Sequence, residues 1–163
     1  MMPERFDLKY TTTDGGDGRP AMIHRAMRGS LERFMAILIE HTAGAFPLWL
    51  APEQIRVLSI TDRTANYASQ VRLRLLGEGL RATADVRSEK IGAKIRQARL
   101  ERIPIMLVVG DRESADETVA VRYRESGDQG AISLDAFLEQ TRARLERSDT
   151  DEEPVDAPDE TRS

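Results

Sequence analysis

The residues best placed to bind a ligand in this sequence are basic and lie close together. Ile91, Ile95 and Ala98 recur at helical spacing, which predicts a helix with one packed stripe and positive charge on its other faces. Such a helix suits an anionic partner, although the same pattern also fits a solvated surface helix. The basic side chains that fill the other faces are Lys90, Lys94, Arg96, Arg99 and Arg102.

Other chemistry is sparsely represented. The sequence has two histidines and no cysteine, which excludes a disulfide framework and a thiolate metal site within this chain. No glycine-rich phosphate loop of the usual spacing follows the apolar segments that end at Ile60 and Val109, so a small-molecule-binding α/β module is the least favoured class. No apolar run approaches the length of a membrane span and no signal-peptide pattern is present, so we expect a cytoplasmic protein without a membrane partner.

The net charge of -4 is unevenly distributed along the chain. Seven acidic residues and one basic residue lie from Ser148 onward, which leaves 23 basic and 21 acidic residues before it. The folded part is therefore mildly basic. The terminal segment also contains Pro154 and Pro158 and almost no large apolar residue, so residues 148–163 are predicted to be a disordered acidic tail.

The basic helix lies within a regular alternation of strand and helix patterns. The helix at residues 65–76 should face inward through Ala68, Val71 and Leu75, and Pro104 should end the basic helix. Together these patterns predict a mixed sheet of four or five strands, parallel in its first part and flanked by helices, and therefore an α/β fold. Strands are predicted at residues 55–60, 80–86, 105–109 and 118–124, and a last helix is predicted after Ser133.

The first part of the chain has a different pattern. Residues 5–10 and 19–24 read as two strands around a glycine-rich turn, and Ser30 reads as the N-cap of a helix that Gly44 and Pro47 end. A hairpin and one helix make a marginal unit, so we expect the end of a larger domain. The proline-bracketed linker at 46–52 predicts a first domain at 1–47 and a second at 48–147.

Several segments together resemble the C-terminal part of bacterial-type threonyl-tRNA synthetases, which are class II aminoacyl-tRNA synthetases. The resemblance covers residues 3–147. It implies a remnant of the class II catalytic domain with its motif 3, followed by a class IIa anticodon-binding domain with a mixed, mostly parallel sheet of about five strands. The segments that carry the resemblance are Arg19 to Ala26, Gly29 to Phe34, Ile39 to His41, Gly44 to Pro52, Arg87 to Gly92, Lys94 to Arg96, Arg102 to Pro104, Gly110 to Glu113 and Val119 to Arg122.

In the first domain the resemblance implies roles in a larger enzyme. His24 matches one of three zinc ligands, but the cysteine and the second histidine are absent, and His41 does not match. Arg33 matches the motif 3 arginine that contacts ATP phosphates, and Gly29 and Ser30 match positions near the adenylate. Motifs 1 and 2 are missing. Zinc and ATP-Mg are thus expected cofactors of an intact enzyme, whereas this chain alone is expected to bind neither tightly and to be inactive.

In the second domain the resemblance implies binding to the anticodon stem-loop of tRNA(Thr), and not to DNA. Glu113 and Arg122 suit the reading of base edges, while Arg96 and Arg102 suit backbone or base contacts. Family members usually carry asparagine in place of Ser88, and serine keeps a donor and an acceptor but loses the bidentate amide. The implied anticodon-contacting residues are Ser88, Lys90, Arg96, Arg102, Glu113 and Arg122.

Two functions from different classes fit these residues. The first is a tRNA-binding fragment of a threonine–tRNA ligase, with a separate catalytic chain as a further candidate partner. The second is a free-standing, non-catalytic RNA-binding or regulatory protein that reuses the anticodon domain. The retained His24 and Arg33 favour the first, because an RNA-binding module has no chemical need for them.

Overall fold

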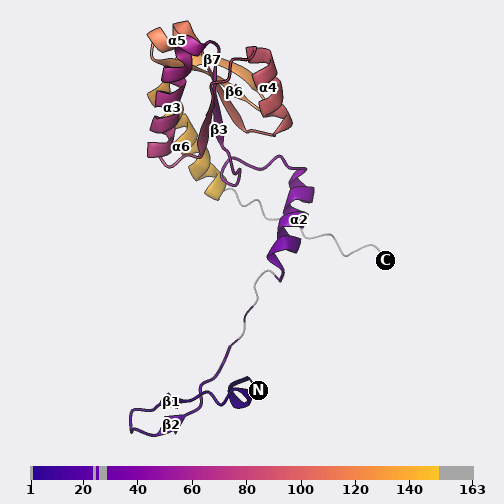
Figure 1. Cartoon of the computed structure of the whole chain (residues 1–163), viewed down its shortest axis with the longest axis vertical. Coiled ribbons are helices and arrows are strands. Elements are labelled where there is room, and N and C mark those ends of the chain that lie inside the picture. Colours follow the sequence, from indigo (N-terminus) through magenta and orange to yellow (C-terminus); the bar gives the residue numbers. More distant parts are fainter. Residues whose placement is uncertain (1, 24, 26–28, 151–163) are drawn as a thin grey trace, which may run out of the picture. The chain divides into compact units, whose positions relative to one another are not determined.

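The computed structural model describes residues 2–23, 25 and 29–150, with side chains described up to residue 146. The chain divides into two compact units, Met1–Leu38 and Ile39–Ser163 (Figure 1). The division falls inside helix α2 (Leu31–Thr42). Among the described residues, no helix is long and apolar enough to cross a membrane.

The first unit contains a short helix and a small hairpin. Helix α1 (Met2–Arg5) is followed by strands β1 (Tyr10–Thr11) and β2 (Asp17–Gly18), which pair antiparallel. The strand predicted at 5–10 is therefore wrong except at Tyr10, and residues 19–23 of the strand predicted at 19–24 do not form a strand. The Thr12 N–H donates to the Gly16 carbonyl at 2.9 Å, so the chain reverses at once and pairing is confined to the turn. Phe6 is 70% exposed, so the alternating apolar residues of this segment do not pack against another described element.

Helix α2 begins and ends as its sequence predicts. The Ser30 Oγ accepts the Arg33 N–H at 3.4 Å, which confirms Ser30 as the N-cap. The helix ends before Ala43 and Gly44, which both have left-handed φ angles of 49° and 73°. None of the residues of α2 is buried, and Leu31 is 61% exposed. Its apolar stripe lies uncovered in this fold.

The second unit is built on a five-stranded sheet with the order β4-β3-β5-β6-β7. Strand β3 is parallel to both β4 and β5, whereas β6 and β7 continue the sheet antiparallel, which confirms a mixed sheet. The strands are β3 (Ile55–Ser59), β4 (Ala82–Asp85), β5 (Ile105–Val109), β6 (Thr118–Tyr123) and β7 (Gly127–Ser133).

Strand β7 was not predicted from the sequence. It is an edge strand whose residues are mostly exposed, so it carries no apolar alternation. Gly127 and Gly130, with φ angles of 73° and 86°, also resemble turn residues when read alone. The strand forms because β6 offers it a free edge with which to pair.

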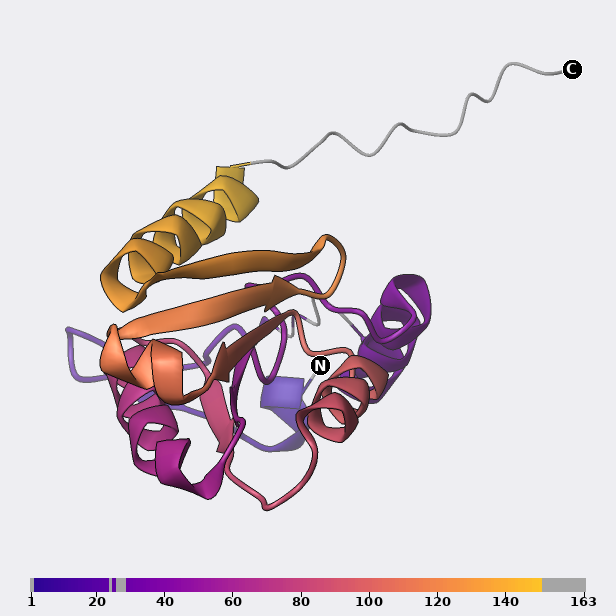
Figure 2. The same ribbon diagram turned by 90° about the horizontal axis from the view of Figure 1, so that it is seen from above.

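Helices cover both faces of the sheet. Helix α3 (Ala65–Gly77) and helix α6 (Leu134–Thr150) cover one face, and α4 (Ile91–Leu100) covers the other (Figures 1 and 2). A short turn η1 (Asp62–Thr64) precedes α3, and α5 (Asp111–Ala115) follows β5. Ala68, Val71 and Leu75 are buried as predicted. Helix α6 runs three residues past the expected boundary at 147, and the remaining part of the predicted tail, 151–163, lies outside the described residues.

The two faces carry cores of different size. The larger core lies under α3 and α6 and includes Val57, Leu107 and Phe137, each fully buried. The smaller core under α4 consists of Leu58, Ala98, Ile103 and Met106.

Helix α4 covers only part of its face. Residues paired across a sheet share a face, so Ala120 and Arg122 lie beside Val108 and Met106 on the α4 side. Both are only half-buried, and Asp128, which pairs with Arg122, is exposed. The α4 face of β6 and β7 is therefore accessible to a ligand.

Candidate nucleic-acid interface

Three arginines on and just after α4 are exposed and lack an acidic partner. Among the described residues, the side chains of Arg96, Arg99 and Arg102 form no ion pair and no hydrogen bond. Together with Gly92, Ile95 and Leu100 they line a shallow hollow of about 450 Å³. By contrast, Arg63 is paired with Asp111 at 3.1 Å. The outer side of α4 therefore carries a concentrated positive charge that no acidic residue neutralises between residues 29 and 146, the continuous range whose side chains are described.

Arg102 has an unfavourable backbone conformation as well as a free side chain. Its φ angle is 60°, in the left-handed region that glycine usually occupies after a helix end. The Ile103 N–H donates back to the Ala98 carbonyl at 3.1 Å, and the Arg124 Nη1 donates to the Arg102 carbonyl at 3.0 Å. These bonds hold a charged side chain at a position where the backbone alone would favour glycine.

Arg122 is presented on the open side of β6 and is held by an acid. Its Nη2 donates to the Asp128 Oδ2 at 2.7 Å, beside an irregularity in the pairing of β6 with β7. The hydrogen bond from Arg122, together with that from the Gly130 N–H, lowers the pKa of Asp128 below its usual value. The other guanidinium N–H groups of Arg122 have no partner among the described residues, so they can donate to a ligand.

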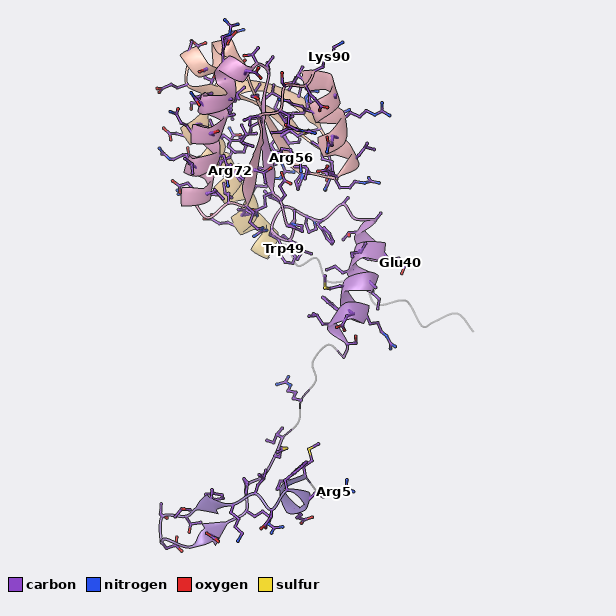
Figure 3. All side chains as sticks on the ribbon, in the orientation of Figure 1. Arg5, Glu40, Trp49, Arg56, Arg72 and Lys90 are labelled. Atoms are coloured by element: carbon purple, nitrogen blue, oxygen red, sulfur yellow. The ribbon has the colours of Figure 1, made fainter. Side chains whose placement is uncertain are left out.

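Ser88, Lys90 and Glu113 lie at the edge where the parallel strands end. Ser88 and Lys90 are exposed in the loop after β4, and Glu113 lies in α5 just after β5. Carboxyl ends of parallel strands share one edge, so the fold gathers these residues there. Lys90 precedes the first turn of α4 and points away from the sheet in Figure 3. The Glu113 Oε2 accepts the Gly110 N–H at 2.9 Å, which fixes the direction of this carboxylate.

Lys94 does not contribute to the charged surface, and its prediction as an exposed residue was wrong. It is 1% exposed, and its Nζ donates to the Ser59 carbonyl at 2.8 Å and to the Asp85 carbonyl at 3.2 Å. Lys94 lies three residues after Ile91 and four before Ala98, so it belongs to the packed stripe of α4. The helical spacing could have indicated that Lys94 is buried. The prediction followed the residue type instead, because lysine side chains are rarely buried.

Asp85 and Arg87 form a contact that the sequence analysis did not select. Asp85 is 9% exposed and accepts from the Arg87 Nη2 at 2.6 Å and from its Nε at 3.0 Å. The hydrogen bond with Arg87 is the main reason that the pKa of Asp85 lies below its usual value. Arg87 also donates to the Gln97 Oε1 at 2.8 Å, which ties the start of the loop to α4.

The candidate residues form an extended surface and do not converge on one pocket. Helix α4 has 10 residues and is about 15 Å long, with Lys90 at one end and Arg102 beyond the other. Arg122 lies opposite Met106, and Glu113 contacts Gly110, which is four residues further along the chain. The backbone positions that hold Arg122 and Glu113 are therefore about 13 Å apart in the direction of β5. An extended, positively charged surface with separate polar groups suits a polymeric anion.

The residues matched to ATP binding lie together in the first unit. Gly29 has a φ angle of 63°, Ser30 caps α2, and Arg33 is exposed in the first turn. The Ser30 hydroxyl also donates to the Glu32 Oε2 at 2.6 Å, which lowers the pKa of Glu32. His24, the expected zinc ligand, lies outside the described residues.

Comparison with known proteins gives consistent matches. Residues 54–144 match the family described as the anticodon binding domain. The threonine–tRNA ligase of Syntrophomonas wolfei is 58% identical over 137 residues, which cover 84% of this chain and 22% of that protein. The threonine–tRNA ligase of Nitrosococcus oceani is 58% identical over 138 residues, covering 85% of this chain and 21% of that protein.

A solved structure is also similar. The crystal structure of the RNA binding domain of threonyl-tRNA synthetase from Cryptosporidium parvum Iowa II aligns with a TM-score of 0.70 and 36% identity. The alignment covers 88% of this chain and 37% of that chain. The present chain spans about a fifth of the length of the curated relatives that it matches.

Proposed function

Because this chain belongs to the anticodon binding domain family, we propose that it is the tRNA-recognition part of a threonine–tRNA ligase and binds the anticodon stem-loop of tRNA(Thr). The whole ligase would use this contact to select the tRNA that receives threonine in an ATP-dependent reaction. The observation that carries the proposal is the group of unpaired arginines along α4, next to an accessible sheet face.

Phosphate binding is proposed for the outer side of α4. Every nucleotide of the loop carries one negative charge, and binding releases the counterions that neutralise it. Arg96, Arg99 and Arg102 are exposed and have no acidic partner in the part of the chain that the structure describes, so contact with phosphate breaks no ion pair there. This part of the binding energy should weaken as the salt concentration rises.

Base recognition is proposed for the open sheet face and the carboxyl edge. Threonine codons begin with A and C, so every threonine anticodon ends in G and then U. Arg122 can donate its planar fork to the O6 and N7 of that guanine, and Glu113 can accept from a base N–H. Arg122 pairs with Met106 and Glu113 contacts Gly110, two backbone positions about 13 Å apart, so the two side chains would contact different bases. Ser88 and Lys90 would contact the loop from the β4 side of the same surface.

The catalytic roles matched in the first unit belong to the same proposal. Arg33 would contact the ATP phosphates, with Gly29 and Ser30 beside the adenylate, once the rest of a catalytic domain is present. Zinc does not fit the described residues, because no group of three His, Cys, Asp or Glu side chains among them could hold a metal ion. His24 would need its other ligands from outside this chain.

The test is binding to RNA stem-loops whose loops differ by single bases. Replacing the guanine of the G-U pair should weaken binding by about 1–3 kcal/mol. Arg122→Ala should abolish most of that discrimination. Arg99→Ala is the matched control. It should weaken binding to every loop, and it should reduce the slope of log binding constant against log salt concentration by the amount expected for about one phosphate contact. Equal affinity for G-U loops and scrambled loops would identify a general polyanion binder and reject the proposal.

A further inference from the structure

We infer that Lys94 is a positioning residue for base recognition, because its buried ammonium group holds in place the loop that carries Ser88 and Lys90. The inference rests on the proposed function, since it concerns how the same surface reads RNA. Neither residue type nor resemblance assigns Lys94 such a role.

The geometry around Lys94 joins three elements at one point. Its Nζ donates to the Ser59 carbonyl at 2.8 Å, to the Ser59 Oγ at 3.3 Å and to the Asp85 carbonyl at 3.2 Å. Ser59 is the last residue of β3, and Asp85 is the last residue of β4. One ammonium group therefore connects α4 to the carboxyl ends of two neighbouring parallel strands.

Packing alone does not account for a lysine at this position. Transfer of an ammonium group from water to a site that is 1% exposed is unfavourable, and neutral oxygens offset it only in part. Lys94 forms no ion pair among the described residues, and the neighbouring Asp85 carboxylate is bonded to Arg87. An apolar side chain would fill the same space in the small core. Only a long donor can bind both strand ends.

Lys94 is placed to hold both ends of the loop at residues 86–90. The loop leaves β4 directly after Asp85, whose carbonyl Lys94 holds, and it ends at Lys90, one helical turn before Lys94. Within the loop, the Arg87 N–H donates to the Asp85 Oδ1 at 3.2 Å and the Glu89 N–H donates to the Arg87 carbonyl at 2.9 Å. Both ends of the loop are thus fixed near the same ammonium group.

Ser88 makes this fixation important for recognition. A serine hydroxyl lies one bond beyond the Cβ, so the backbone decides almost entirely where it can donate or accept. A recognition group works when it is held within about 0.5 Å of its productive position. Loosening the loop should therefore affect the base that Ser88 contacts and leave the base contacted by Arg122 unaffected.

The first experiment is amide hydrogen exchange on the free protein, with Lys94→Met compared with the wild type. Methionine keeps the length of the side chain and removes the donors. We expect at least tenfold faster exchange at the Arg87 and Glu89 amides, with no change at Val119 or Val121 in β6. The control is Arg99→Met, which removes a cation from the exposed side of the same helix and should leave all four amides unchanged. Unchanged exchange at Arg87 and Glu89 in a folded Lys94→Met protein would overturn the inference.

The second experiment uses RNA stem-loops with each loop base replaced in turn. Ser88→Ala identifies the base whose discrimination depends on Ser88, and Lys94→Met should lose about tenfold of discrimination at that same base. Discrimination at the guanine should be retained, because Lys94 does not hold Arg122. The salt dependence of binding should also be retained, because Lys94 is buried and contacts no phosphate. Uniform loss at every base would show a merely structural lysine. If the wild type shows no base preference, the proposed function fails, while the exchange measurement still decides the role of Lys94.

A milder variant covers the case in which Lys94→Met does not fold. Ser59→Ala removes the hydroxyl that accepts from Lys94 and itself donates to the Asp85 carbonyl at 3.3 Å. Faster exchange at Arg87 and Glu89 in this variant, by a smaller factor, supports the inference. Exchange equal to the wild type contradicts it.

Discussion

Arginine residues in the second unit divide into those that the protein binds internally and those that it leaves free. Arg56 lies within the sheet in Figure 3 and contacts Glu101 at 2.6 Å, and its hydrogen bond with Glu53 is the main cause of its raised pKa. Arg96, Arg99 and Arg102 lie on one exposed surface without such partners among the described residues. Internal pairing stabilises the fold, whereas free arginines are available to a phosphate. The position of each arginine thus separates structural roles from the binding roles proposed above.

The replacement Arg102→Gly should separate binding from stability. Glycine adopts a φ angle of 60° without strain, so relief of the strain should outweigh the larger entropy of the unfolded chain, with a net gain of up to about 1 kcal/mol. Stem-loop affinity should fall because the guanidinium group is lost. Urea unfolding and RNA binding measure the two effects. Arg102→Ala is the control, since it loses the same group but keeps the strained backbone. A glycine variant that binds RNA like the wild type would remove Arg102 from the interface.

At the scale of elements, the connection from β4 to α4 organises the candidate interface. Asp85 ends the strand, Arg87 links it to Gln97, and Lys94 joins α4 to both strand ends. None of these contacts belongs to a regular hydrogen-bonding ladder. They explain how an exposed loop can present Ser88 in a defined place.

The Asp85 contact should make stability depend on pH in a defined direction. Its folded-state pKa lies below the ordinary value of 3.8, so its contribution is present above that value and is lost as the pH falls through the folded pKa. Asp85→Asn should therefore lower the free energy of unfolding by about 1–2 kcal/mol at pH 7. Chemical unfolding of the wild type and of Asp85→Asn, at pH 7 and near pH 2.5, measures the difference in their free energies of unfolding. A difference between wild type and variant that is equally large at both pH values would contradict the pairing with Arg87.

Helix α4 also carries a glycine whose replacement gives a sharp test. Gly92 lies in the first turn without a positive φ angle, and an added Cβ would meet nothing within 4 Å. Gly92→Ala should stabilise the protein by about 0.5–1 kcal/mol because alanine favours the helix. Gly79, with a φ angle of 79°, also has open space around it, so Gly79→Ala should destabilise by about 1 kcal/mol through backbone strain alone. Thermal or urea unfolding of the two variants measures both effects. A change in the free energy of unfolding of the same sign in Gly92→Ala and Gly79→Ala would contradict this explanation.

At the scale of the whole molecule, the folded second unit extends further toward the N-terminus than the predicted boundary at 48. Arg124 donates to the carbonyls of Ala45 and Phe46 at 3.4 and 3.2 Å, and Arg81 donates to those of Trp49 and Ala51 at 2.7 and 2.9 Å. The segment predicted as a linker is thus bonded to the sheet domain. The compact unit begins at Ile39.

The 163-residue chain on its own is expected to lack threonine-dependent ATP–pyrophosphate exchange. The resemblance places only motif 3 in this sequence, and the described residues offer no metal-binding group of three side chains. Exchange measured with the purified chain, with a full-length threonine–tRNA ligase as the positive control, should give no signal. Zinc should also be lost on dialysis, because a lone histidine binds it weakly. Robust exchange, or zinc retained in a one-to-one ratio, would show a catalytic or metal site that the resemblance does not account for.

Local patterns in the amino-acid sequence were sufficient to predict the family and most of the sheet domain. The comparisons confirm the resemblance to threonyl-tRNA synthetases. Strand β5 has the predicted bounds, because its continuous apolar run of isoleucine, methionine, leucine and valine has only one favourable environment. The buried face of α3 was equally clear, since its apolar spacing coincides with the helical repeat. Local chemistry also predicted the start of α2, where Ser30 accepts the Arg33 N–H.

Features that depend on neighbours distant in sequence became evident only in the folded structure. Strand β7 exists because β6 offers a free edge, and the short hairpin near the N-terminus has no layer to cover its alternating residues. Lys94 is buried because two strand ends place three acceptor oxygens where its ammonium group reaches. The separation of Arg122 from Glu113 follows from strand register, which no local pattern contains. Residue types and local periodicity report a residue's own preferences, whereas burial, pairing and distance are set by residues that the chain brings together only when it folds.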